Sequence, residues 1–249
     1  MPQDAPENPV PEFSIMIPAL NEEGSIEQVL CELFEVLGTA TPYEVIVADD
    51  GSTDATPEIL NRLKDNELFA GRLSVVRHAR PCGKASALRS AAKAAKGGWL
   101  LTMDADGQND PRDFEGLRAP TLAENPPALV CGIRTSRQTT GARRVASKIA
   151  NWIRRTALND DCPDTACGVK YIRRDVFLDL PLFDGQHRFY PALVKLYGHC
   201  SANAPVSDRT RMAGQSKYTN LGRAIVGFFD LLGVVWLRKR TKPPVPSDG

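Results

Sequence analysis

Two aspartates follow an apolar run in the stretch LLTMDADGQNDP, residues 100–111. Asp104 and Asp106 are separated by one residue, so on extended backbone their carboxylates point the same way and can converge on one divalent cation. Gln108 continues the row with a neutral oxygen. Oxygen ligands of this type suit Mg²⁺ or Mn²⁺, which keep open positions for phosphate oxygens. A solvated turn is the competing interpretation, because Asp and Gly are common turn residues.

Two further acidic segments follow apolar runs in the same way. Asp49 and Asp50 come directly after EVIVA, and Glu22 follows SIMIPALN. Asp49 is well placed to accept hydrogen bonds from a nucleotide base, whereas a turn or a helix cap competes for Asp50. The carboxyl ends of parallel strands form the ligand-binding edge of an α/β sheet. We therefore expect three acidic strand ends in one crevice.

Strand and helix patterns alternate from Phe13 to about residue 132. The apolar runs predict strands at 13–18, 43–50, 73–78, 99–104 and 128–132, and the periodic segments predict helices at 24–38, 56–66, 83–97 and from 110 onward. Ser25 and Gln28 have capping-box spacing, and Thr56 is expected to cap the second helix. This alternation predicts an α/β fold with a mainly parallel sheet covered by helices on both faces.

The pattern loosens after Gly132. We expect a basic helix over about 143–158, a strand within 168–177, a helix over 187–199, an edge strand at 202–208 and a basic loop at 209–218. Residues 224–237 carry one charge, Asp230, and a basic triplet follows them. This stretch is too short to span a bilayer, and a helix lying in the headgroup layer explains its composition. A core-packed helix and a truncated membrane span are the alternatives.

Composition sets the remaining limits. The 249 residues carry a formal charge of +1, which argues against binding nucleic acid by bulk electrostatics. None of the six cysteines forms a CxxC pair, so we interpret them as reduced thiols of a cytoplasmic protein. The proline-rich start has no apolar core of a signal peptide. We expect a lead at 1–11, one domain at 12–219, a membrane-interface helix at 220–240 and a disordered tail at 241–249.

Four motifs in order, SIMIPALNEEGSI, VIVADDGSTDAT, GKASAL and TMDADGQNDP, together resemble family 2 glycosyltransferases of the GT-A fold. The resemblance implies a nucleotide-sugar donor and a divalent cation, Mg²⁺ or Mn²⁺, held by Asp104, Asp106 and Gln108. It also implies a donor pocket formed by Pro18, Ala19, Asn21, Glu22, Asp49, Asp50, Lys84, Asp104 and Ala105.

The second half of the chain is similar to the polyprenyl-phosphate glycosyltransferases of the dolichyl-phosphate mannose synthase group. The segments that carry the similarity are GIRTSR, SKIAN, DTACGVKYIRRDVF and RTRMAGQSKY. It implies catalytic roles for Asp106, Arg211 and Lys217, and acceptor-phosphate contacts from Arg134, Ser147 and Lys148. His187 stands at about the place where hydroxyl-acceptor relatives keep their catalytic acid, and we interpret it as an orienting or acceptor-phosphate residue. Lys148 stands where the group usually has arginine, and lysine lacks the bidentate geometry. DTACG replaces the more usual T-S-G.

The expected reaction is inverting transfer of a hexose to a polyprenyl phosphate at the cytoplasmic face of a membrane. The family resemblance alone favours GDP-mannose as the donor, and UDP-linked sugars are the alternative donors. A phosphate monoester, with a second pKa of about 6, is already a nucleophile and needs no general base. One alternative is transfer to a sugar hydroxyl, which would need a carboxylate as general base near His187, and Asp184 is the candidate. Another is a catalytically silent nucleotide-binding membrane partner. A dinucleotide-binding site is excluded because no GxGxxG follows the first strand.

Overall fold

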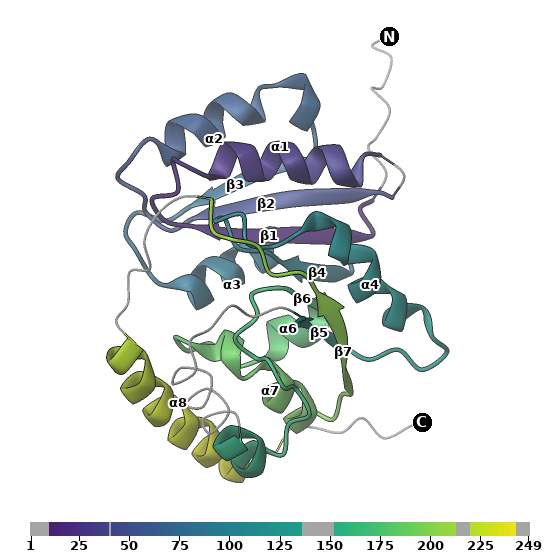
Figure 1. The fold of residues 1–249 in the computed structure, drawn as a ribbon, viewed down its shortest axis with the longest axis vertical. Coiled ribbons are helices and arrows are strands. Elements are labelled where there is room, and N and C mark those ends of the chain that lie inside the picture. The colour runs from purple at the N-terminus through teal and green to yellow at the C-terminus, as the bar shows by residue number, and fades with distance from the viewer. Residues whose placement is uncertain (1–9, 40, 136–151, 213–219, 243–249) are drawn as a thin grey trace.

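The computed structural model describes residues 10–39, 41–135, 152–212 and 220–242. One seven-stranded sheet runs through the molecule in the order β3-β2-β1-β4-β6-β5-β7 (Figure 1). Its strands are β1 (Phe13–Ala19), β2 (Tyr43–Asp49), β3 (Leu73–Arg77), β4 (Trp99–Thr102), β5 (Leu129–Arg134), β6 (Lys170–Arg173) and β7 (Ser201–Val206). All neighbours pair in parallel except β6, which is antiparallel to both β4 and β5. The predicted α/β class with a mainly parallel sheet is confirmed.

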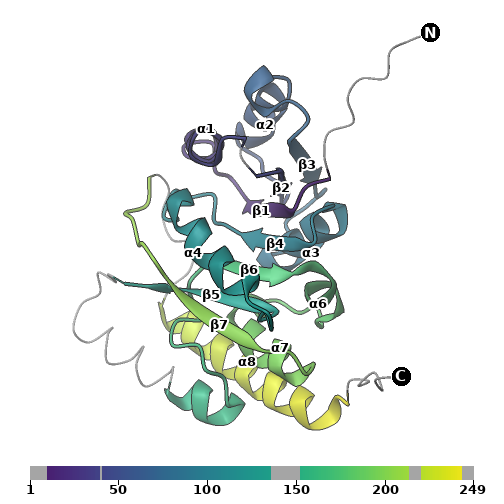
Figure 2. The same cartoon turned by 90° about the vertical axis from the view of Figure 1, so that its right-hand side faces the viewer.

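Helices cover both faces of this sheet (Figures 1 and 2). The first face carries α1 (Ile26–Leu37), α2 (Thr56–Lys64) and α4 (Phe114–Arg118), and the second carries α3 (Lys84–Ala94), α6 (Arg174–Asp179), α7 (Tyr190–Leu196) and α8 (Asn220–Arg240). A further helical segment spans residues 152–158. Within the described ranges each predicted helix is therefore present, although several are shorter than expected.

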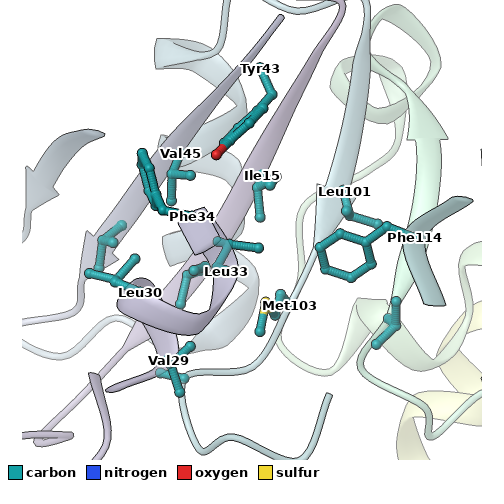
Figure 3. Packing of buried hydrophobic residues seen from close by; sticks show 14 of the residues in the cluster. Ile15, Val29, Leu30, Leu33, Phe34, Tyr43, Val45, Leu101, Met103 and Phe114 are labelled. Atoms are coloured by element: carbon teal, nitrogen blue, oxygen red, sulfur yellow. The ribbon is translucent and has the colours of Figure 1, made fainter. Parts of the chain in front are cut away.

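The first core lies between β1, β2, β4 and α1 (Figure 3). Phe34 is 2% exposed, and its ring makes an edge contact with Phe69 at a centroid distance of 4.7 Å. The buried side of α1 ends on Phe34, and Leu37, one turn further on, is partly buried against the same core. On the opposite face α3 buries mainly alanines, so its backbone can approach β1 and β2 closely.

Neither predicted side-chain cap bond forms, although Ser25 does stand at the N-cap position of α1. Ser25 makes no cap bond to α1, because its hydroxyl instead donates to Glu22 Oε2 at 3.1 Å. Thr56 is the first residue of α2, not its cap, and its Oγ1 accepts the Glu22 N–H at 2.8 Å. Asp54 accepts the Thr56 N–H at 3.0 Å. Both hydroxyls therefore bind the loop that follows β1.

The segment at 168–177, predicted as a strand, divides into β6 and α6. β6 lies between β4 and β5, and Lys170 pairs with Thr102 on one side and Cys131 on the other. An antiparallel strand begins at the edge where its parallel neighbours end. Residues that precede β6 are therefore delivered to the carboxyl-end edge of the sheet.

The C-terminal helix α8 packs one side on the second core and leaves an apolar side exposed. Leu231 and Val234 are buried, whereas Phe229 is 66% and Trp236 63% exposed. Arg238 donates to the Ala157 carbonyl at 3.1 Å, which ties the helix end to 152–158. Among the helices described, none has the length and apolar character that crossing a bilayer demands.

Candidate active site

Three acidic strand ends meet at one edge of the sheet, as the sequence predicts. β1 lies between β2 and β4, and Ala19 at its end is in register with Asp49 at the end of β2. Asp104 and Asp106 follow the end of β4 in a turn that contains Gly107 at φ +77°. The carboxylates on this turn form the centre of the candidate site.

Asp104 is held from three sides. Its Oδ1 forms an ion pair with the Lys84 ammonium at the start of α3. Its main-chain N–H donates to Asn109 Oδ1 at 2.8 Å, and a Cβ on Gly168 would lie only 2.2 Å from its Oδ2. Burial by itself would raise the pKa of Asp104, but Lys84, Lys170 and Arg211 lower it overall. Asp104 is therefore an ionised, well-oriented carboxylate.

Asp106 is 6% exposed and has a different environment. Its Oδ1 accepts the Gln108 N–H at 3.1 Å, and its Oδ2 lies 2.9 Å from Arg211 Nη2. Burial raises the pKa of Asp106, and the negative charge of Asp104 raises it further. A bound cation reduces the electrostatic repulsion between two carboxylates that lie this close together. The donor set of Asp104, Asp106 and the Gln108 amide thus fits Mg²⁺ or Mn²⁺.

The chain after β7 crosses over this turn. The Met212 N–H donates to the Asp106 carbonyl at 3.0 Å, and the Arg209 N–H donates to the Gln108 carbonyl at 3.2 Å. Gly107 adopts φ +77°, which favours glycine, and a Cβ there would lie 2.4 Å from Met212 Sδ. The segment brings Arg211 to Asp106, as the sequence motif implies. Lys217 lies outside the described residues, and its catalytic role stays a prediction.

Most residues predicted to form the donor pocket lie at the ends of β1 and β2 and in the loops that follow, and their nucleotide contacts stay predictions. Asn21, at φ +55°, donates its N–H to Ser52 Oγ at 2.9 Å and accepts the Thr53 N–H on Oδ1 at 2.8 Å. Pro18 is partly buried, and Ala19 and Ala105 are buried. Asp49 is fully buried, with Oδ1 accepting the Ser52 N–H at 2.9 Å and Oδ2 3.2 Å from Arg77 Nε.

Asp50 is engaged within the protein. Its Oδ1 lies 2.7 Å from His78 Nδ1 and accepts the Cys82 N–H at 2.9 Å, and its Oδ2 accepts the Gly83 N–H at 2.8 Å. The other ring nitrogen of His78 is 2.9 Å from Ser90 Oγ. Asp50 therefore anchors the loop that places Lys84, and sequence reasoning missed its partner His78. A direct nucleotide contact from Asp50 stays a prediction.

Asp50, His78 and Cys82 also form a group of potential metal ligands, because their ligand atoms all lie within 4.8 Å of one another. A proton on His78 Nδ1 already satisfies both His78 and Asp50. The group is therefore explained as a structural hydrogen-bond network.

On the acceptor side, Arg134 forms a bidentate pair with Asp164 at 2.8 and 2.9 Å, and its Nη1 lies 4.0 Å from Asp208. This pairing fixes the guanidinium at the carboxyl end of β5. Ser147 and Lys148 lie outside the described residues. Phosphate contacts by these three residues stay predictions.

His187 is near the cations of the site. Burial lowers its pKa well below the usual value, and the charges of Lys84, Lys170 and Arg188 lower it further. Its Nδ1 is buried and has no hydrogen-bond partner among the residues described. The neighbouring Asp184 is exposed, and its Oδ1 lies 3.3 Å from where a Cβ on Gly83 would be. His187 is therefore a neutral imidazole beside the loop that carries Lys84.

Known proteins are similar to this chain in sequence and in fold. Residues 14–180 match the family model described as Glycosyl transferase family 2. The dodecaprenyl-phosphate galacturonate synthase of Rhizobium johnstonii is 31% identical over 242 residues, covering 93% of this chain and 69% of that protein. An undecaprenyl-phosphate 4-deoxy-4-formamido-L-arabinose transferase of Proteus mirabilis is 30% identical over 228 residues, covering 88% of this chain and 66% of that protein. This chain thus spans about two thirds of the length of both relatives.

Among solved structures, the fold is similar to glucosyl-3-phosphoglycerate synthase from Mycobacterium tuberculosis in complex with Mn²⁺, UDP-glucose and phosphoglyceric acid. The TM-score is 0.68 at 20% identity, over 96% of this chain and 82% of that one. At this identity the likeness establishes the GT-A-like fold alone. The family match covers more than half of the chain, and the chain therefore belongs to glycosyl transferase family 2.

Proposed function

We propose that this glycosyltransferase moves a sugar from a nucleoside diphosphate to a polyprenyl phosphate, with a divalent cation on Asp104 and Asp106. The observation that carries the proposal is the arrangement of charge around one turn. Lys84 contacts Asp104, and Arg211 lies 2.9 Å from Asp106. A site that opposes paired carboxylates with two cations is suited to a cation–diphosphate complex.

The residues of the chain divide the chemical work. The Asp104 and Asp106 carboxylates and the Gln108 amide would hold Mg²⁺ or Mn²⁺, which when bound supplies positive charge to the departing diphosphate. Lys84 and Arg211 would add hydrogen-bond donors for the oxygens of the departing diphosphate. Asp49, at the end of β2, would accept a hydrogen bond from the base.

The acceptor assignment rests on the two polyprenyl-phosphate relatives and on the chemistry of phosphate. A lipid phosphate is ionised at neutral pH, with a second pKa of about 6, and can attack the anomeric carbon without a general base. Cationic side chains then orient it, and Arg134 is the described candidate for that role. The neutral imidazole of His187 can donate a hydrogen bond to a phosphate oxygen.

A sugar hydroxyl is the second candidate acceptor. It would need a general base, and Asp184 is an exposed carboxylate beside Gly83, next to Lys84. A hydroxyl acceptor therefore predicts that Asp184 is essential, whereas a phosphate acceptor predicts that it is dispensable.

For the donor, we place UDP-linked sugars ahead of GDP-mannose. The sequence resemblance favours mannose, but the relatives are named for galacturonate and 4-deoxy-4-formamido-L-arabinose. The structural relative was solved with Mn²⁺ and UDP-glucose. The lipid acceptor also requires a membrane contact, for which we propose the exposed apolar side of α8.

The test is a matrix of radiolabelled UDP- and GDP-sugars against short polyprenyl phosphates, with Mg²⁺ or Mn²⁺. We expect labelled product in the organic phase, lost in Asp106→Ala and kept in the matched control Asp65→Ala, which changes an exposed aspartate after α2. Product found only in the aqueous phase would replace the lipid acceptor with a soluble one.

A further inference from the structure

Lys170 is a lysine inside the core. It is 1% exposed, at the first position of β6 in the middle of the sheet. Its Nζ donates to the main-chain carbonyls of Thr165, at 3.3 Å, and Cys167. Burial of an ammonium group costs several kcal/mol, so a lysine here needs a compensating role. Its hydrogen bonds point to that role, because they hold the loop that precedes β6.

That loop ends on Gly168, which lies against Asp104. A Cβ on Gly168 would lie 2.2 Å from Asp104 Oδ2 and 2.8 Å from its Cγ, so the glycine backbone itself packs on the carboxylate. The Gly168 carbonyl accepts the Thr102 hydroxyl at 2.6 Å, and the same hydroxyl oxygen accepts the Lys170 N–H at 3.0 Å. Lys170 and Thr102 thus hold the two ends of one short loop.

The same ammonium also acts on Asp104 through space. Burial would raise the pKa of Asp104, Lys84 has the largest opposing influence, and the Lys170 charge adds to it. Lys84 is partly exposed and contacts the carboxylate directly, whereas Lys170 is enclosed and donates to main-chain carbonyl oxygens. The two lysines therefore do different work on one carboxylate.

We infer that Lys170 is a positioning residue for Asp104: by holding the carbonyls of Thr165 and Cys167 it keeps Gly168 against the carboxylate and fixes the orientation in which Asp104 binds a divalent cation. Lys170 touches neither substrate nor cation. The inference rests on the metal role of Asp104 in the proposed function. Ligand-orienting contacts of this kind are worth about 10- to 100-fold in metal affinity.

The test is a Mn²⁺ titration of Lys170→Met, read by electron paramagnetic resonance with UDP or GDP, whichever the wild type binds. We expect Mn²⁺ binding about 10- to 100-fold weaker, with cooperative thermal unfolding retained. The matched control is Lys93→Met, the same exchange at an exposed lysine of α3, which should bind Mn²⁺ like the wild type. A folded Lys170→Met protein that binds Mn²⁺ within twofold of wild type would overturn the inference.

A second variant covers the case in which Lys170→Met does not fold. Thr102→Val removes the hydroxyl that donates to the Gly168 carbonyl while keeping the shape of the side chain, and it should also weaken Mn²⁺ binding. Unchanged affinity in this variant would likewise refute the positioning role. Failure of the proposed function looks different, because the wild type would then bind Mn²⁺ no better than Asp106→Ala.

Discussion

The exposed side of α8 gives a quantitative prediction about membrane binding. Phe229 and Trp236 are seven residues apart, close to two helical turns, so both side chains lie on one side of the helix. They are 66% and 63% exposed, while Leu231 and Val234 on the other side are buried. We expect the double variant Phe229→Ala/Trp236→Ala to lose membrane affinity and to keep its fold.

The magnitude follows from the exposed fractions. Full burial of a large apolar side chain is worth about 1.5–3 kcal/mol, so two side chains that are about two thirds exposed can contribute roughly 3 kcal/mol together. Each 1.4 kcal/mol is about tenfold in an equilibrium constant, which gives a loss of roughly 100-fold in the vesicle partition coefficient. The basic residues at the end of α8 are unchanged in this variant, so the residual binding should be sensitive to salt.

The assay is co-sedimentation with vesicles that contain an anionic phospholipid. Leu122→Ala is the matched control, because Leu122 is 68% exposed and belongs to the short helical turn Ala119–Leu122 after α4. The control should pellet like the wild type. If the double variant also pellets like the wild type, the apolar side of α8 is not the membrane contact.

Three further predictions concern the site. Arg211→Met should lower kcat by roughly 10²–10³ in steady-state assays with smaller changes in donor KM, because in the proposed function the guanidinium stabilises the leaving diphosphate. A change confined to KM would contradict this role. Asp184→Asn should leave turnover with a lipid phosphate within about twofold of wild type, since no base is needed, and loss of turnover would support a hydroxyl acceptor. The pKa of His187 is lowered from 6.5, so the unfolded chain binds the proton first as pH falls below about 6.5. The free energy of unfolding of the wild type, measured by urea titration, should then fall by at most about 1.4 kcal/mol for each pH unit below 6.5, until His187 itself is protonated. His187→Gln should reduce this dependence on pH. Equal slopes in the two proteins would rule out His187 as its source.

Much of the fold could be predicted because its strands are continuous apolar runs separated by periodic helices. β1, β2 and β4 carry this signal strongly, and their ends carry the acidic residues, so the central edge of the site follows from the sequence. The order β2-β1-β4 then brings Asp49 and Asp104 to one edge.

The remainder depends on partners far apart in the chain. The direction of β6 is set by its pairing with β4 and β5, and no local pattern encodes that choice. The Thr56 hydroxyl accepts the Glu22 N–H, which is 34 residues away, and Asp50 binds His78, which is 28 residues away. Lys170 was not predicted because lysine is almost never fully buried, and its sequence context does not reveal its position between two strands.

The loop at 183–189 also has a geometric consequence. Gly185, at φ +76°, lets Asp230 of α8 approach to 2.8 Å from where its Cβ would be, and on the other side Asp184 lies against Gly83. Residues 184 and 185 therefore lie between α8 and the loop that precedes Lys84. If α8 rests on lipid as proposed, this contact would set the distance between the candidate site and the headgroups.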